Sequence, residues 1–205
     1  MNEFSSQPLS KDVLQKFKGE IENIPEAGKV VIIVGYHKLE TAWGKVIEIE
    51  FRRNVKDVGE KVTFFEVSNP QRVETGEDSP LSNAEISNFI RQMGKVELVI
   101  DLHEHPGSVA SRVRNSWSLK TGDQAVIDEA KSAVPDLRTL PFDDYSRKRT
   151  GGLNISYAIT DPDLPSGGID NYVSGEVTPE MQQAIDTNLK FIVQLANIGL
   201  RHSKV

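Results

Sequence analysis

Apolar positions along the chain fall into helical stripes and short continuous runs. Residues 10–22 follow a capping serine and carry apolar side chains at a spacing typical of a helix. The runs at 29–36 (KVVIIVGY) and 95–102 (KVELVIDL) are apolar throughout, as strands buried on both faces of a parallel sheet are. The segments 45–51 and 61–67 are also predicted to be strands.

The second half of the chain continues this alternation. A capping-box pattern starts a predicted helix over 82–93, and a second helix is predicted over 123–134. Short strands are predicted near 153–159 and over 172–177, and a long helix is predicted from 179. Together these elements predict an α/β fold, with a mostly parallel or mixed twisted sheet flanked by helices.

Length and composition narrow the class of protein. The 205 residues fit a single domain, 1–205, with 38% hydrophobic and 26% charged residues, as in ordinary globular proteins. A formal net charge of -6 argues against a nucleic-acid-binding surface. There is no cysteine, so any metal must be held by His, Asp or Glu.

The chain shows no sequence feature of a membrane protein or of a secreted one. Its first residues lack the apolar core of a signal peptide. No apolar run approaches the ~18 residues that a transmembrane helix needs. We therefore expect a cytoplasmic protein without membrane or nucleic-acid partners, and a homo-oligomer is compatible with the sequence.

Histidines follow the two most apolar runs. His37 and Glu40 come after the first run, and His103 and His105 come at the end of the second. Ligands of open α/β sheets bind beyond the carboxyl ends of strands, so these residues are expected at one edge. Three protein ligands leave a fourth position for water, as in catalytic zinc sites. His37, Glu40 and His103 are the preferred set, because a Pro-Gly pair after His105 predicts that this residue lies further out.

Two carboxylates are candidates for the chemistry around such a metal. Glu176 ends the predicted strand 172–177 and is a candidate general base and acid, although acids are also common near helix N-termini. Asp101 is two residues before His103 on the same strand, so it is a candidate to orient a ligand imidazole. His202, the fourth histidine, is expected at the surface.

Three motifs resemble the zinc carboxypeptidase superfamily, and within it the succinylglutamate desuccinylase/aspartoacylase family. They are HKLE at 37–40, DLH at 101–103 and SGEV at 174–177. The family binds zinc through an HxxE pair and a later His, and its catalytic carboxylate precedes a helix. The resemblance implies a zinc-carboxypeptidase-like fold, one Zn²⁺ per chain and hydrolysis of an amide bond in an N-acyl amino acid, with Glu176 handling protons.

The resemblance also suggests residues that bind the substrate. The family often has an Asn-Pro pair near substrate-binding arginines, and Asn69-Pro70 precedes Arg72 here. Its further Asn-Arg pair is missing, which leaves three arginines as candidates for a substrate carboxylate. The full candidate set is Asn69, Arg72, His105, Arg112, Arg114 and Tyr157, with Tyr172 as an alternative to Tyr157.

Two other functions remain open on this sequence. One is a metallocarboxypeptidase that acts on a peptide or a cell-wall fragment and uses the same zinc and Glu176. The other is a catalytically silent metal-binding module with the same fold.

Overall fold

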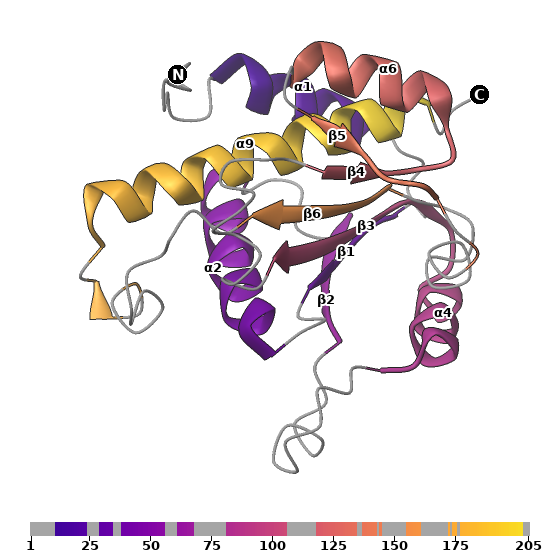
Figure 1. Ribbon diagram of the computed structural model, residues 1–205, viewed down its shortest axis with the longest axis horizontal. Helices are drawn as coiled ribbons and strands as arrows, with labels where there is room; N and C mark the ends of the chain where they lie inside the picture. Colours follow the sequence, from indigo (N-terminus) through magenta and orange to yellow (C-terminus); the bar gives the residue numbers. More distant parts are fainter. Residues whose placement is uncertain are drawn as a thin grey trace.

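The computed structural model describes most of the chain, and its elements are drawn in Figure 1. The described residues are 11–23, 29–34, 38–55, 61–67, 81–105, 118–134, 137–142, 144, 155–160, 172, 174–175 and 177–202.

A sheet of six strands lies at the centre of the described structure. Its order is β2 (Val62–Glu66), β1 (Lys29–Val34), β3 (Val96–His105), β6 (Ile155–Thr160), β4 (Ser118–Lys120) and β5 (Arg138–Thr139). Neighbouring strands are parallel except for β4 and β6, which are antiparallel. The prediction of a mixed, mainly parallel sheet flanked by helices is confirmed.

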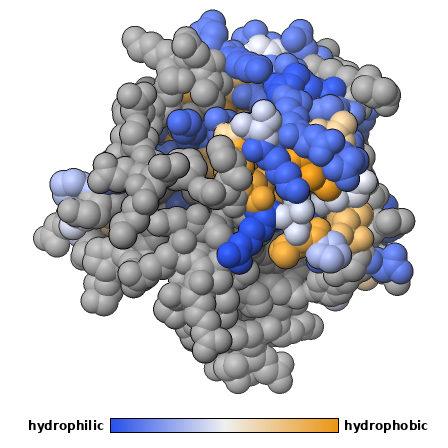
Figure 2. All heavy atoms as spheres, turned by 45° about the horizontal axis from the view of Figure 1, so that its top comes forward, coloured by the Kyte–Doolittle hydropathy of each residue, from blue (hydrophilic) through white to orange (hydrophobic). Residues whose placement is uncertain are grey.

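Helices cover both faces of the sheet, but unequally (Figure 1). One face carries the larger core, to which four helices contribute: α1 (Lys11–Glu22), α2 (Lys38–Asn54), α6 (Gln124–Ala133) and α9 (Pro179–His202). The other face carries a smaller core under α4 (Asn83–Gln92). When the side with α1 and α6 is turned forward, most of its described surface is hydrophilic, as expected for helices that bury one face (Figure 2).

β1 shows why an apolar run without alternation forms a central strand. Val30, Ile32 and Val34 belong to the larger core, whereas Val31 and Ile33 belong to the smaller one. Successive side chains of a strand point to opposite faces, so a strand covered on both faces needs apolar residues throughout. Burying each such side chain contributes about 1.5–3 kcal/mol.

The capping box of α4 forms as the sequence predicts. The Glu85 N–H donates to Ser82 Oγ at 3.3 Å, and the Ser82 N–H donates to Glu85 Oε2 at 2.7 Å. Gly94 follows the helix with a φ of +86°, a conformation that glycine adopts without the strain of a Cβ. Phe89 stacks on Phe65 of β2 and holds the helix against the sheet.

Two of the predicted strands are not strands in the structure. Residues 45–51 belong to α2, where Ile47 and Phe51 are buried four residues apart while Ile49 is 39% exposed; Val55, just after the helix, continues this spacing. Tyr172 and Ser174 are helical and Gly175 lies in a turn, so 172–177 is not a strand. The strands predicted at 61–67 and near 153–159 are confirmed as β2 and β6, whereas β4 and β5 were not predicted. No described helix has the length and apolar character needed to cross a membrane.

Candidate metal and catalytic site at the carboxyl edge of the sheet

The two strands that carry the candidate zinc motifs are neighbours. β1 and β3 pair in parallel, with Ile33 beside Asp101. Their carboxyl ends therefore lie at the same edge, to which the arrowhead of β3 points in Figure 1. His103 comes two residues after Asp101, so its backbone lies just beyond the level of Val34, where the chain leaves β1.

Glu40 belongs to the first turn of α2, which begins at Lys38 shortly after β1 ends. In the sequence, the HxxE motif at 37–40 thus lies between the end of the central strand β1 and the first turn of α2. α2 packs against both β1 and β3. The backbone of Glu40 and the backbone of His103 therefore belong to elements that share one core.

β3 is longer than the sequence indicated, and this changes the position of His105. The strand runs to His105, with His103 beside Ala158 and His105 beside Thr160 of β6. The predicted end of the strand at Leu102 is wrong, because pairing with β6 extends the strand to His105. His103 and His105 are alternate positions of one strand, so both remain candidates for the third ligand.

Asp101 lies deep in the sheet beside these histidine positions. It is only 1% exposed, and its cross-strand neighbours are Ile33 of β1 and Ser156 of β6. Asp101 has an interaction partner, and a carboxylate buried to this degree needs one. Its predicted role as an orienting partner of a ligand imidazole stays a prediction.

Most of the candidate side chains lie outside what the structure describes. His37, Asn69, Arg72, Arg112, Arg114 and Glu176 are outside the described residues, and for Glu40, His103, His105 and Tyr157 only the backbone is described. Among the side chains that are described, no three His, Asp or Glu residues form a group able to hold a metal ion.

The residues around Glu176 form a turn and a helix start. The Gly175 N–H donates to the Tyr172 carbonyl at 3.2 Å, and Gly175 has a φ of +83°. Thr178 Oγ1 then accepts a hydrogen bond from the Met181 N–H at 3.2 Å, which caps α9. Figure 1 shows that α9 begins on the side of the sheet to which β3 and β6 point.

A buried polar cluster joins Tyr172 to α2. The sequence did not predict it. The Tyr172 hydroxyl donates to Glu50 Oε1 at 2.5 Å, and Arg53 Nη1 donates to the same carboxylate oxygen at 2.6 Å and to the Tyr172 oxygen at 3.0 Å. Glu50 is 7% exposed and Tyr172 is 8% exposed. We call Glu50, Arg53 and Tyr172 the tyrosine clamp. No local pattern marks this cluster, because Tyr172 is 122 positions from Glu50 and 119 positions from Arg53.

The environment of the clamp keeps the tyrosine neutral. Burial, and then the hydrogen bond to Glu50 and its negative charge, raise the pKa of Tyr172 to about 12. The Arg53 guanidinium lies 5.8 Å from the centre of the Tyr172 ring and partly offsets this effect. In turn, hydrogen bonding to Glu50 raises the pKa of Arg53.

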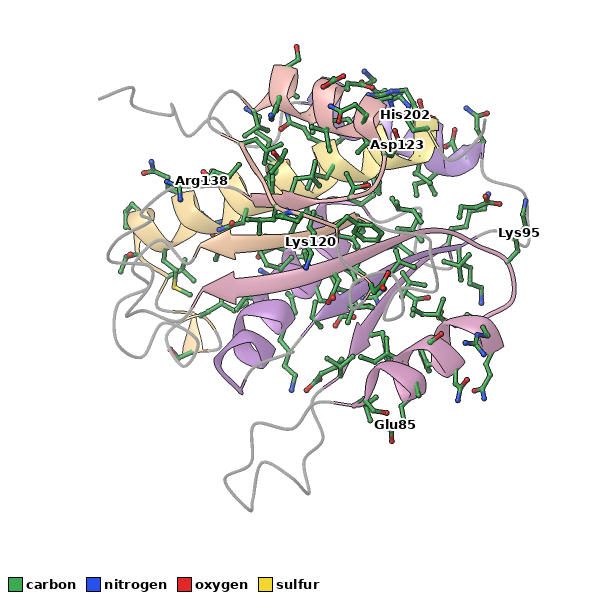
Figure 3. The ribbon with its side chains drawn as sticks, turned by 45° about the vertical axis from the view of Figure 1, so that its right-hand side comes forward. Glu85, Lys95, Lys120, Asp123, Arg138 and His202 are labelled. Atoms are coloured by element: carbon green, nitrogen blue, oxygen red, sulfur yellow. The ribbon has the colours of Figure 1, made fainter. Side chains whose placement is uncertain are left out.

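The other end of α9 is held by a second ionic cluster. Glu129 of α6 accepts from Arg201 and lies 2.9 Å from His202 Nε2. Figure 3 shows His202 at the end of α9, next to α6. The expectation of a surface histidine is wrong in part, because the side chain of His202 is only 26% exposed and has a carboxylate partner.

Comparisons with known proteins add no relative. The sequence matches no protein-family model and no curated protein. The function of this chain is therefore inferred from its motifs and from the elements that carry them.

Proposed function

We propose that this chain is a zinc-dependent hydrolase that cleaves the amide bond of an N-acyl amino acid or a similar small substrate. The observation that supports the proposal most is the parallel pairing of β1 with β3. An HxxE motif follows one of these strands and a DLH motif ends the other. A mixed sheet with a parallel centre also agrees with a zinc-carboxypeptidase-like fold.

The donor set fits zinc in its chemistry. Two imidazoles and one carboxylate, from His37, Glu40 and His103, match the ligands of open catalytic zinc sites. The elements that carry Glu40 and His103 share one packed core, which favours a fixed spacing of the ligands. Zinc in such a site would polarise the substrate carbonyl and lower the pKa of a coordinated water.

The residues of the chain supply the other functions of the proposed site. Glu176 accepts a proton from the attacking water and delivers it to the departing amine nitrogen. In the sequence Glu176 comes shortly before α9, which begins on the side of the sheet to which β3 and β6 point, so this role is compatible with the fold. Arg72, Arg112 and Arg114 are the candidates to bind a substrate carboxylate, with Asn69, His105 and Tyr157 as further substrate-binding candidates.

Elemental analysis of purified variants tests the metal site. We expect about one zinc per chain in the wild-type protein and a loss of zinc in His37→Ala and His103→Ala. His202→Ala is the matched control, because His202 pairs with Glu129 at the far end of α9 and should keep its zinc. Loss of zinc in His105→Ala, with retention in His103→Ala, would replace His103 by His105 in the ligand set. Full zinc content in His37→Ala would contradict the site.

Turnover of a substrate panel tests the reaction. Glu176→Gln should keep its zinc and lose about 10²- to 10⁴-fold in kcat on N-acyl amino acids, the usual contribution of a general base. Activity on peptides alone would favour the alternative function, a metallocarboxypeptidase. Bound zinc without turnover of either class would make the protein a silent metal-binding module, and equal turnover of wild type and Glu176→Gln would remove Glu176 from the reaction.

A further inference from the structure

A cross-strand row of polar residues leads from Asp101 to Lys120. Asp101 of β3 pairs with Ser156 of β6, and Ser156 pairs with Lys120 of β4. Residues that pair directly across neighbouring strands belong to the same face of a sheet. Asp101 is also beside Ile33, which belongs to the smaller core, so this row lies on the face of the sheet that carries α4.

A second row, two positions further along β3, ends at Arg138. His103 is beside Ala158 of β6, which is in turn beside Ser118 of β4. Ser118 is beside Arg138 of β5. Neighbouring strands lie about 4.8 Å apart, so three strand spacings put the backbones of His103 and Arg138 about 14 Å from each other. The backbone of a candidate zinc ligand and an arginine therefore share one row of the sheet.

This side of β4 and β5 is open to solvent. Leu119 and Leu137 are buried in the larger core, so the residues next to them along each strand belong to the other face. On that face Lys120 is half-buried, Arg138 is exposed, and Leu140 is 42% exposed. The strand residues of the smaller core come from β1, β2 and β3, so that core leaves β4 and β5 uncovered.

Lys120 and Arg138 have the chemistry to hold a negatively charged group. A guanidinium presents a planar fork of N–H donors that matches a carboxylate. Arg138 forms no ion pair with any residue that the structure describes, so its charge is available to a ligand. Lys120 has an interaction partner, but an ammonium group carries three donor hydrogens and can bind a ligand as well.

From this arrangement we infer that Lys120 and Arg138 form an anion-binding site on the open face of β4 and β5, and that this site binds the substrate carboxylate in the proposed hydrolase. The second part rests on the proposed function, since it relates the two cations to the candidate zinc ligands of β3. The row through His103 then gives the orientation of the substrate. Its amide bond lies towards β3, and its carboxylate lies towards β5.

A binding titration tests the site without any turnover. N-acetylglycine carries a carboxylate, and N-acetylglycinamide is a neutral analogue of nearly the same shape. We expect the backbone amide NMR signals of 118–120 and 137–140 to shift saturably with the first probe and to stay unchanged with the second. The Kd for N-acetylglycine should rise about 10- to 100-fold in Arg138→Gln and in Lys120→Gln, because each variant loses a charge-assisted hydrogen bond.

Lys95→Gln is the matched control. It removes one positive charge from a side chain that is 61% exposed and that lies just before β3, at the opposite end of the sheet from Arg138 (Figure 3). Its affinity should equal that of the wild type. Arg138→Gln changes an exposed side chain and should fold, so it decides the test even if Lys120→Gln does not fold. Equal binding of the two probes, wild-type affinity in Arg138→Gln, or an equal loss in Lys95→Gln overturns the site.

Kinetics separates failure of the anion site from failure of the proposed function. In an active enzyme, the preference in kcat/KM for N-acetylglycine over N-acetylglycinamide should fall about 10- to 100-fold in Arg138→Gln, with unchanged zinc content. If the wild-type protein hydrolyses no N-acyl amino acid, the proposed function fails, whereas the titration still decides whether the anion site exists. An unchanged preference in a variant that binds N-acetylglycine more weakly overturns the assignment of this site to the substrate carboxylate.

Discussion

Gly44 of α2 lies directly against Val34, the last residue of β1. A Cβ placed on Gly44 would lie 2.7 Å from the Val34 Cβ, closer than real Cβ atoms come to a neighbour. Only glycine allows this approach, which brings α2 against the strand that it follows.

Gly44→Ala should therefore destabilise the protein. Overpacking typically costs about 1–3 kcal/mol, and it should outweigh the gain of up to ~1 kcal/mol that alanine gives inside a helix. Denaturant unfolding of the variant measures the difference. The matched control is Gly19→Ala in α1, where a Cβ would meet nothing within 4 Å and the helix-propensity gain should appear alone. A Gly44→Ala protein as stable as Gly19→Ala would contradict the close packing of α2 on β1.

Removing the cap of α4 should weaken the protein measurably. Ser82→Ala removes the oxygen that accepts from the Glu85 N–H, a loss worth about 1 kcal/mol. Thermal or denaturant unfolding gives the change. Glu85→Ala removes the reciprocal bond, and the double variant should lose less than the sum of the two, because the bonds belong to one motif. Strict additivity would show that the two bonds act independently.

The clamp predicts a specific loss of stability at high pH. The pKa of Tyr172 is raised from 10.0 to about 12, so its neutral form is favoured in the folded state. This contribution is fully present below pH 10 and is lost as the pH rises to about 12. The unfolding free energy of the wild type should fall more steeply over that interval than that of Tyr172→Phe. Parallel curves for the two proteins would show that Tyr172 titrates like an unpaired tyrosine.

The second ionic cluster predicts a loss of stability at low pH. Partial burial alone would raise the pKa of Glu129, but hydrogen bonds from His202 and Arg201 outweigh it and lower this pKa below its ordinary value of 4.5. The stabilisation is therefore present above pH 4.5 and disappears as the pH falls through the lowered pKa. Glu129→Gln should be less stable than wild type at neutral pH, and the difference should shrink in acid. A difference that is independent of pH would mean that the glutamate charge plays no part.

The elements predicted correctly from the sequence are those whose hydrophobic pattern fits only one kind of secondary structure. β1 is apolar throughout and α4 has a complete capping box, so each was recognisable by itself. The strand prediction for residues 45–51 is wrong because Val46, Ile47 and Ile49 are β-branched, and β-branched residues favour strands. The buried set Ile47, Phe51 and Val55 has helical spacing, but recognising it required reading beyond residue 51.

The positions of the candidate site residues depend on strands and helices that are distant in the sequence, so no local pattern predicts them. β3 continues to His105 because β6, from much later in the chain, pairs with its last residues. The strand predicted at 172–177 is wrong, because the hydrogen-bond partners of Tyr172 lie on α2, part of which is also predicted to be a strand. The sequence predicts that the residues after β1 and β3 lie at one edge of the sheet, but the direct pairing of these two strands is known only from the structure.

α9 packs against α1, α2, α6 and β3. α1 and α9 come from opposite ends of the described chain, so this part of the cover of α1 depends on a very distant helix, whereas Phe17 also packs edge-on against Phe51 of α2. Contacts of such long range slow folding, because the entropy of closing a large loop is lost before the contacts form. Part of the apolar stripe of α1 therefore stays exposed until α9 docks, and refolding at high protein concentration should be prone to aggregation through this helix.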